Sequence, residues 1–313
     1  MDTSCSVVVP VFNSESTLRE LVGRLGVELP KLASRYEVIL VNDCSRDRSW
    51  DVVCGLAKER PWVRGINLRR NFGQHNALLC GLRAARYAVT VTMDDDLQHP
   101  PEEIVKLLSK LDEGFDVVYG APRKRPQSFW RSIVTRATKR TLAFVMGIPS
   151  VREIAAFRAF RTELRSAFET YQSPDVIIDV LLSWGTTRFG VTVVDEMPRQ
   201  VGRSNYTLRK LVAITISVLA NFSTAPLRFA SLLGLLLTLF GVAVLAYVLI
   251  VYFAAGSVPG FPFLASIVTI FSGTQLFALG IFGEYLGRMF HRSMGRPTYV
   301  IRASVGSGSE PQP

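Results

Sequence analysis

The sequence predicts an α/β domain with a mostly parallel sheet, followed by an amphipathic helix and two transmembrane helices. Two observations predict the sheet: apolar runs with the pattern of strands alternate with amphipathic helical patterns, and the connections between them are short. Such alternation favours parallel strands covered by helices on both faces. A third observation, two long uncharged segments after Arg228, predicts the membrane region.

The strands and helices of the first domain can be assigned in chain order. Strands are expected at Ser6–Phe12, Tyr36–Asp43, Val63–Leu68, Ala88–Met93 and Asp116–Tyr119. Helices are expected at Ser14–Leu29, Asp47–Arg60, Gln74–Arg86 and Pro100–Asp112, the last with Pro-Pro-Glu-Glu at its start and Gly114 just past its end. Ligands of such sheets bind outside the carboxyl ends of the strands. Polar clusters stand at these ends: Asn13, Asn42-Asp43, Arg69-Arg70 and Asp94–Asp96.

Four parts are expected along the chain. Residues 1–205 form the cytosolic domain, residues 206–228 a juxtamembrane segment, residues 229–290 a transmembrane hairpin and residues 291–313 a cytoplasmic tail. The two spans, Phe229–Phe253 and Phe261–Gly283, carry no charge. Lys and Arg gather before the first and after the second, which places both termini in the cytoplasm and the linker Ala254–Pro262 on the other side. A buried core hairpin in a soluble protein is the alternative.

The juxtamembrane segment has apolar residues at helical spacing, with Arg209 and Lys210 on its other side. This pattern is typical of a helix lying on the cytoplasmic leaflet, or of an ordinary packing helix. The apolar residues are Leu208, Leu211, Val212, Thr215, Val218, Leu219 and Phe222. The N-terminus lacks the pattern of a signal peptide, and the four cysteines lack metal-ligand spacing, which favours reduced thiols in a cytosolic domain.

The formal net charge of +10 indicates an anionic partner: nucleic acid, anionic lipid or a phosphorylated substrate. The positive charge is grouped. No acidic residue occurs from Val117 through Arg152, where eight basic residues lie, and none occurs from Met197 to Gly283. Such runs are usually solvated faces, but a basic face beside a membrane-entry helix is also where a lipid phosphate would bind. Nucleic-acid binding would explain the charge but neither the spans nor the acidic cluster described next.

The acidic cluster is Asp94-Asp95-Asp96, at the end of an apolar strand and followed by Leu97-Gln98-His99-Pro100. Three consecutive carboxylates repel one another, and a hard divalent cation such as Mg²⁺ or Mn²⁺ would relieve the repulsion. A metal there could also bridge the diphosphate of a nucleotide ligand. A solvated acidic turn is the alternative, and the position at a strand end favours the functional interpretation. Asp95 is expected to point to the other side of the strand from Asp94 and Asp96.

Six motifs, in this order, resemble the family-2 glycosyltransferases of the GT-A (Rossmann-like) fold, in particular the branch that uses polyprenyl phosphates. Dolichol-phosphate mannose synthase and the bacterial undecaprenyl-phosphate glucosyl- and aminoarabinosyl-transferases belong to this branch. The resemblance covers Ser6 to Arg302 and includes the two spans. The motifs are Val8–Asn13, Val41–Ser45, Arg70–Gly73, Asp94–Pro101, Phe157–Arg161 and Arg199–Tyr206.

The resemblance implies transfer of a sugar, with inversion, from a UDP- or GDP-linked donor to a polyprenyl phosphate for cell-envelope glycosylation. It implies Mg²⁺ or Mn²⁺ as cofactor, with Asp94, Asp96 and Gln98 as the metal site. Catalytic roles fall to Asp94, Asp96, Glu153 and Arg158, and donor binding to Pro10, Phe12, Asn13, Glu15, Asp43, Arg70, Asp94 and Asp95. Phosphate and acceptor binding fall to Arg123, Arg125, Arg131, Arg199, Arg203, Ser204 and Tyr206. Relatives also contact membrane lipids and often form homo-oligomers through the membrane region.

Three positions depart from the family pattern. Ser14 stands where relatives often have Glu, Glu153 stands where they usually have Asp, and Asn205 replaces a lysine between Ser204 and Tyr206. Two other functions are alternatives. A processive polysaccharide synthase would carry Gln-x-x-Arg-Trp, but no tryptophan here follows an arginine. A membrane scaffold or inactive paralogue that only binds nucleotide sugar is compatible with Glu153 and Asn205.

Overall fold

The computed structural model describes residues 4–122, 155–173, 175–197, 225–255 and 260–306. The chain forms two compact units, and its path leaves the first unit, builds the second, and returns to the first. Unit 1 contains Met1–Val212 and Gly295–Pro313, and unit 2 contains Ala213–Met294.

Unit 1 is built on one mixed sheet, whose described strands lie in the order β7-β5-β6-β4-β1-β2-β3-β8. Of these, β6 and β8 run antiparallel to their neighbours and the others run parallel. The predicted α/β fold with a mostly parallel sheet is therefore confirmed. The strands are β1 Ser4–Val11, β2 Arg35–Asn42, β3 Val63–Leu68, β4 Val89–Thr92, β5 Val117–Pro122, β6 Arg158–Arg161, β7 Phe189–Val194 and β8 Ile301–Val305.

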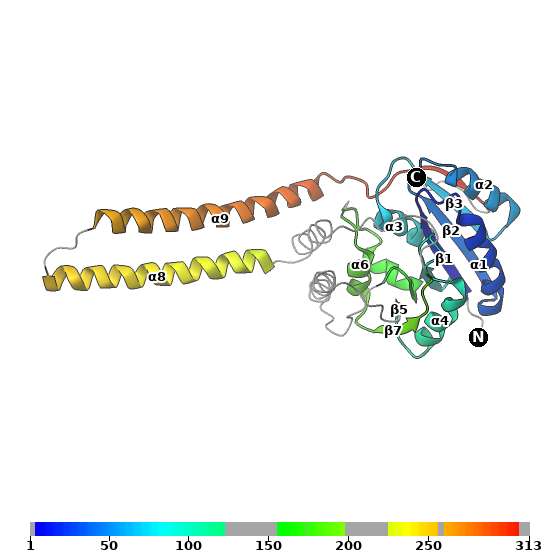
Figure 1. Cartoon of the computed structure of the whole chain (residues 1–313), viewed down its shortest axis with the longest axis horizontal. Coiled ribbons are helices and arrows are strands. Elements are labelled where there is room, and N and C mark those ends of the chain that lie inside the picture. The colour runs from blue at the N-terminus through cyan, green and yellow to red at the C-terminus, as the bar shows by residue number, and fades with distance from the viewer. Residues whose placement is uncertain (1–3, 123–154, 174, 198–224, 256–259, 307–313) are drawn as a thin grey trace. The chain divides into compact units, whose positions relative to one another are not determined.

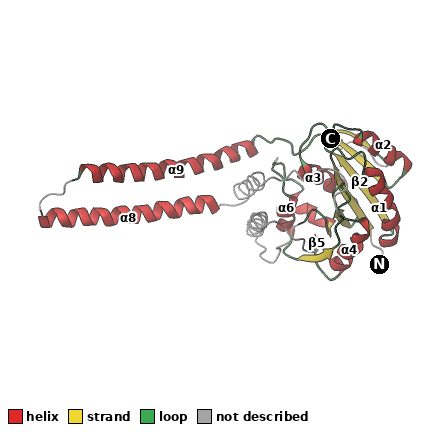
Figure 2. Ribbon diagram, viewed as in Figure 1, coloured by secondary structure: helices red, strands yellow, loops and turns green. Residues whose placement is uncertain are grey.

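Helices cover both faces of this sheet (Figures 1 and 2). Alternate residues of β1 explain why: Val7 and Val9 pack into a core with α1, α2 and α4, while Val8 faces Gly81 of α3 on the other face. The helical elements of unit 1 are α1 Leu18–Leu32, α2 Ser49–Glu59, α3 Gln74–Ala84, η1 Pro101–Glu103, α4 Ile104–Asp112, η2 Thr162–Phe168 and α6 Ile178–Gly185.

The start of α1 differs from the prediction. The sequence pattern places it at Ser14, but the helix begins at Leu18. Ser14 cannot cap it, because its hydroxyl donates to the carboxylate of Asp95 and its backbone N–H donates to Ser49 Oγ at 2.8 Å. Asn13, just before the predicted start, has a φ of 55°. Residues 12–16 therefore form a loop above β1.

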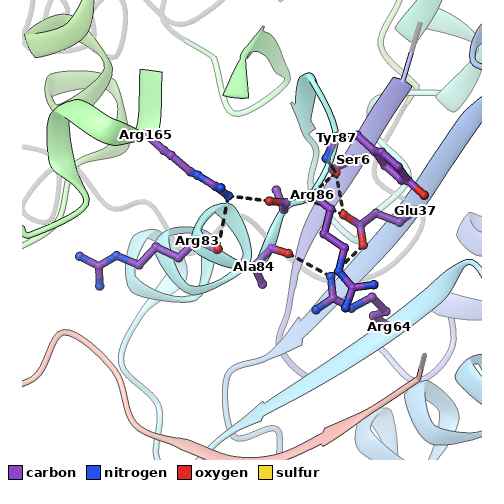
Figure 3. A network of polar contacts seen from close by, with 9 residues as sticks. Ser6, Glu37, Arg64, Arg83, Ala84, Arg86, Tyr87 and Arg165 are labelled. Atoms are coloured by element: carbon purple, nitrogen blue, oxygen red, sulfur yellow. Dashed lines mark hydrogen bonds and ion pairs between the residues drawn. The ribbon is translucent and has the colours of Figure 1, made fainter. Parts of the chain in front are cut away.

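A buried polar network fixes the opposite, amino-terminal edge of the sheet (Figure 3). Glu37 of β2 is 3% exposed and accepts hydrogen bonds from Ser6 Oγ at 2.7 Å and Arg64 Nη1 at 2.8 Å. It also accepts the backbone N–H of Arg86 at 2.8 Å. One carboxylate thus ties together β1, β2, β3 and the connection from α3 to β4. Removing one partner would leave a buried charge unpaired and destabilise the fold. The network lies at the edge away from the carboxyl ends of the strands.

The C-terminal region corrects the predicted domain division. Residues 291–313 were expected to form a cytoplasmic tail, but Ile301–Val305 forms β8, antiparallel to β3. The backbone N–H of Arg69 donates to Val300 O at 2.9 Å, which extends this contact to the loop after β3. Five residues are too few to mark a strand by sequence pattern alone, and pairing with the edge of β3 makes Ile301–Val305 a strand.

The described part of unit 2 contains two long helices, α8 Ala225–Ala255 and α9 Phe261–Ser293, which pack against each other. Within the described part of the chain, one helix is long and apolar enough to cross a membrane: α8, over Leu227–Val251. The expected second span lies within α9. The predicted amphipathic segment, Leu208 to Phe222, lies outside the described residues.

We expect Gly81→Ala to destabilise unit 1, because a Cβ at this position would overlap Val8 Cγ1 and lie 3.1 Å from Val41 Cγ2. Overpacking of this kind costs about 1–3 kcal/mol. Thermal unfolding of the purified protein would measure it. Gly23→Ala in α1 is the matched control, since a Cβ there meets nothing within 4 Å and should stabilise the helix slightly. Equal melting temperatures for the two variants would contradict the expected close packing.

Candidate active site

Three strands that meet at the centre of the sheet end in unusual backbone conformations. Asn13, Cys44 and Leu97 follow β1, β2 and β4, and their φ angles are 55°, 57° and 59°. In the described chain these are the residues other than glycine with positive φ. Such conformations are costly for residues with a Cβ, and they gather at functional sites, where the surrounding structure enforces them. The chain order changes direction between β4 and β1, which is where open α/β sheets bind their ligands.

The acidic cluster lies in a turn after β4. The strand ends at Thr92, so strand alternation does not orient the three aspartates, and the predicted reason for separating Asp95 from its neighbours is wrong. Asp95 instead accepts hydrogen bonds from the backbone N–H of Phe12 at 3.1 Å and from the Ser14 hydroxyl. Burial raises the pKa of Asp95, against the effect of these two bonds, and the charge of Asp96 raises it further. Asp95 therefore joins the acidic turn to the loop above β1.

The other two aspartates have different partners. Asp94 Oδ1 accepts a hydrogen bond from Gln74 Nε2 at 2.7 Å, and Asp96 Oδ1 accepts one from the backbone N–H of Gln98 at 3.1 Å. In the described residues no group of three or more His, Cys, Asp or Glu side chains is gathered as a metal site. Two carboxylates and the amide of Gln98 still match the oxygen ligands of Mg²⁺ and Mn²⁺, if ligand phosphates or water complete the shell. The donor set therefore fits such an ion.

Asp43 is fixed on the other side of β1, at the end of β2. It is 3% exposed, and its two carboxylate oxygens accept the backbone N–H groups of Phe72 at 2.7 Å and Gly73 at 2.8 Å. Burial raises the pKa of Asp43, and these two hydrogen bonds oppose the shift. Asp43 thus holds the loop after β3, and its predicted bond to a nucleobase stays a prediction. Arg70 in the same loop stacks over the ring of Phe72, with 4.5 Å from Cζ to the ring centre.

Four further residues with predicted donor contacts lie in β1 or in the loop above it. Pro10 is buried within that strand, and Phe12 is 45% exposed beyond its end. Asn13 Oδ1 accepts the backbone N–H of Arg46 at 2.8 Å, and Glu15 Oε2 accepts that of Arg48 at 2.8 Å. The side chains of Asn13 and Glu15 therefore join the loops after β1 and β2, and their contact with a donor stays a prediction.

Arg158, predicted to be catalytic, lies inside the domain. It is 1% exposed, and its guanidinium donates to Thr92 Oγ1 at 3.0 Å and to the carboxylate of Asp179. Tyr119 Oη donates to the same carboxylate at 2.9 Å. The negative charges of Asp179 and Asp94 help to raise the pKa of Arg158. The ion pair of Arg158 and Asp179 thus contacts Thr92, the last residue of β4 before the acidic turn. The catalytic role of Arg158 stays a prediction. Sequence reasoning missed Asp179 and Tyr119, because nothing local marks them as partners.

The remaining predicted residues lie outside the described parts of the chain: Glu153, Arg123, Arg125, Arg131, Arg199, Arg203, Ser204 and Tyr206. Described residues next to these segments form hydrogen bonds with the end of β4 and with the acidic turn. Strand β5 ends at Pro122, just before residues 123–154, and Ala156 O, just after them, accepts the Thr92 hydroxyl at 2.8 Å. The backbone N–H of Met197, two residues before Arg199, donates to Gln98 O at 2.9 Å.

Comparison with known proteins identifies the family. The family model described as "Glycosyl transferase family 2" matches residues 6–168. The chain belongs to this family. It is a glycosyltransferase with a GT-A-like fold. A solved structure of the glucosyl-3-phosphoglycerate synthase of Mycobacterium tuberculosis has a similar fold, with a TM-score of 0.52 and 20% identity over 70% of this chain and 78% of that one.

Similar curated proteins extend over nearly the whole glycosyltransferase. An undecaprenyl-phosphate 4-deoxy-4-formamido-L-arabinose transferase of Pseudomonas syringae pv. syringae is 31% identical over 97% of this chain and 91% of its own length. The protein of the same name from Proteus mirabilis is 33% identical over 96% of this chain and 94% of its own length. The similarity thus includes the globular unit and the two long helices.

We expect Arg158→Met to lower the free energy of unfolding of the glycosyltransferase by about 3–5 kcal/mol, because it leaves Asp179 buried without its charged partner. Chemical denaturation measures the loss. The double variant Arg158→Met with Asp179→Leu removes both charges and should recover most of the stability. If the double variant is as unstable as the sum of the two single variants, the two residues do not act as a pair.

Proposed function

We propose that this glycosyltransferase moves a sugar from a UDP- or GDP-linked donor to a polyprenyl phosphate at the cytoplasmic face of a membrane. The observation that carries the proposal is the similarity to undecaprenyl-phosphate transferases over more than nine tenths of both chains. A second observation supports it: the acidic turn and the loops after β1, β2 and β3 come together at the edge where α/β sheets bind nucleotides.

Donor binding would use the loops that converge there. Phe12 and Asn13 would line the nucleoside pocket beside Pro10, Asp43 would accept from the base, and Arg70 would face the diphosphate. Asp94, Asp96 and Gln98 would hold Mg²⁺ or Mn²⁺. When bound, such an ion neutralises the nucleoside diphosphate and stabilises it as a leaving group.

The reaction follows from the acceptor. A phosphate monoester has a second pKa of about 6 and is already a nucleophile at neutral pH. Its oxygen would attack the anomeric carbon as the bond to the donor diphosphate breaks, which inverts that carbon and releases the nucleoside diphosphate. Catalysis then depends on placement of the two anions and on shielding of their charge more than on a strong base. Glu153 would orient the acceptor if it replaces the family aspartate.

The acceptor phosphate would meet the basic residues outside the described chain. Arg123, Arg125 and Arg131 lie in a segment that starts at the carboxyl end of β5, and Arg199 follows Met197, which is bonded to Gln98. Arg203, Ser204 and Tyr206 come a few residues later. Arginine suits this task because its guanidinium can bind phosphate oxygens through two parallel hydrogen bonds.

Two membrane spans are supported by chain connectivity. In sequence, unit 1 includes residues before and after the helical unit. If the globular unit stays on one side of a membrane, the chain must therefore cross that membrane an even number of times. If α8 crosses once, α9 must cross back, and its 33 residues extend about 50 Å, which exceeds the hydrocarbon thickness. This topology would put the globular unit and both termini in the cytoplasm.

Transfer to lipid tests the proposed function directly. Membranes that contain the protein would be incubated with undecaprenyl or decaprenyl phosphate and a panel of UDP- and GDP-sugars, and lipid-linked sugar would be measured. Formation of a polyprenyl-monophosphate sugar supports the proposal. Donor binding without transfer to any lipid phosphate would favour the nucleotide-sugar-binding scaffold instead.

We predict that Asp96→Ala abolishes transfer while the protein still folds, because it removes a carboxylate ligand of the metal. The same lipid-transfer assay, at saturating Mg²⁺ or Mn²⁺, measures the effect, with melting temperature as the folding control. Activity above about a tenth of the wild-type value would exclude a direct ligand role, since such a ligand supports a transition-state charge worth several kcal/mol. Asp94→Ala should be nearly as severe.

We predict that the linker between the helices faces away from the cytoplasm. Ser257, which lies outside the described residues, would be changed to Cys in a variant without the four native cysteines. A membrane-impermeant thiol reagent should label it only from the far side of sealed membranes. Labelling from the cytoplasmic side alone would contradict a two-span topology.

A further inference from the structure

The loop after β3 contacts both carboxylates that flank the candidate donor site. The backbone N–H groups of Phe72 and Gly73 bind Asp43, and the side chain of the next residue, Gln74, binds Asp94. Asp43 follows β2 and Asp94 follows β4, on the two sides of β1. Three consecutive residues therefore connect the nucleoside side of the site to the metal side.

This turn is held in place from several directions. Gly73 has a φ of 95°, a conformation that favours glycine, and its carbonyl accepts the backbone N–H groups of Asn76 and Ala77 at 3.0 and 3.1 Å. Asn76 Nδ2 donates to Phe72 O at 2.7 Å. Gly81 lets α3 pack closely on β1. Because its backbone is fixed, Gln74 can place an N–H donor at a defined position beside Asp94.

The chemistry of the contact suits a metal ligand. The amide of Gln74 is neutral, so its hydrogen bond orients Asp94 without cancelling the negative charge that attracts a cation. A lysine at the same position would compete with the metal. Residues that hold metal-binding carboxylates by hydrogen bonds commonly change metal affinity when they are removed.

We propose that Gln74 is a positioning residue that orients Asp94 for the divalent cation of the donor complex. This inference rests on the proposed function, since it assumes that the acidic turn binds a metal with a nucleoside diphosphate. Gln74 acts through Asp94, and Phe72 and Gly73 fix Asp43 through their backbone, so the two contacts can be separated by side-chain substitution.

Metal binding to the purified full-length protein tests the proposal. Mn²⁺ would be titrated in the presence of UDP or GDP and followed by electron paramagnetic resonance. Gln74→Met, which keeps the length of the side chain but has no N–H donor, should weaken Mn²⁺ binding on the order of tenfold, as expected for loss of one hydrogen bond to a charged group. Gln74→Asn keeps the amide but is one methylene shorter, and it should have a similar effect.

Two further measurements separate positioning from a structural role. Nucleotide binding in the presence of EDTA should be the same for Gln74→Met and the wild type, because the backbone contacts to Asp43 remain. The melting temperature should also stay unchanged. A variant that binds Mn²⁺ as well as the wild type would overturn the proposal, since the side chain would then only fill space.

Failure of the proposed function has a different result: if the wild-type protein binds neither Mn²⁺ nor the nucleotides, the donor site itself is wrong and the inference falls with it. If it binds both but forms no lipid-linked sugar, the lipid acceptor is wrong and the inference about Gln74 stands.

Discussion

Mutual repulsion among Asp94, Asp95 and Asp96 is the constraint around which the rest of the site is arranged. Three adjacent carboxylates at the end of a buried strand are unfavourable unless each has its own partners. The structure separates them: Gln74 binds Asp94, the loop above β1 binds Asp95, and the backbone of Gln98 binds Asp96. The partners come from different segments, so the hydrogen bonds of the three aspartates hold these segments next to one another.

The separation also gives the three aspartates different electrostatic tasks. Asp95 accepts hydrogen bonds from the backbone N–H of Phe12 and the hydroxyl of Ser14, and these bonds join the acidic turn to the loop above β1. Asp94 and Asp96 flank it and accept hydrogen bonds from Gln74 and from the backbone of Gln98. Beneath the acidic turn, the buried ion pair of Arg158 and Asp179 is neutral as a whole, and the guanidinium of Arg158 donates to Thr92 Oγ1 at the end of β4. The pair therefore fixes the strand end from which the acidic turn starts.

Sequence patterns predicted the parts of the fold that depend on local periodicity. The strand at Val63–Leu68 and the start of α3 at Gln74 agree with the structure, because apolar alternation and a preceding glycine determine them locally. The predicted start of α1 was wrong, and strand β8 was not predicted. Both depend on partners far away in sequence: Asp95 for Ser14, and the edge of β3 for Ile301–Val305. The site shows the same division. The acidic turn was visible as a motif, whereas Gln74, Asp179 and Tyr119 become functional candidates only through contacts that no spacing rule encodes.

Where the chain returns to unit 1 after α9, its backbone contacts the loop after β3. Only six residues separate the end of α9 at Ser293 from Val300, whose carbonyl binds the backbone N–H of Arg69. Arg69 precedes Arg70 and the Phe72–Gln74 turn, so the strand that follows the helical unit supports the loop that holds both Asp43 and Asp94. An unstructured tail would have given the loop no such support, so the edge strand β8 belongs with the segments that hold the candidate site.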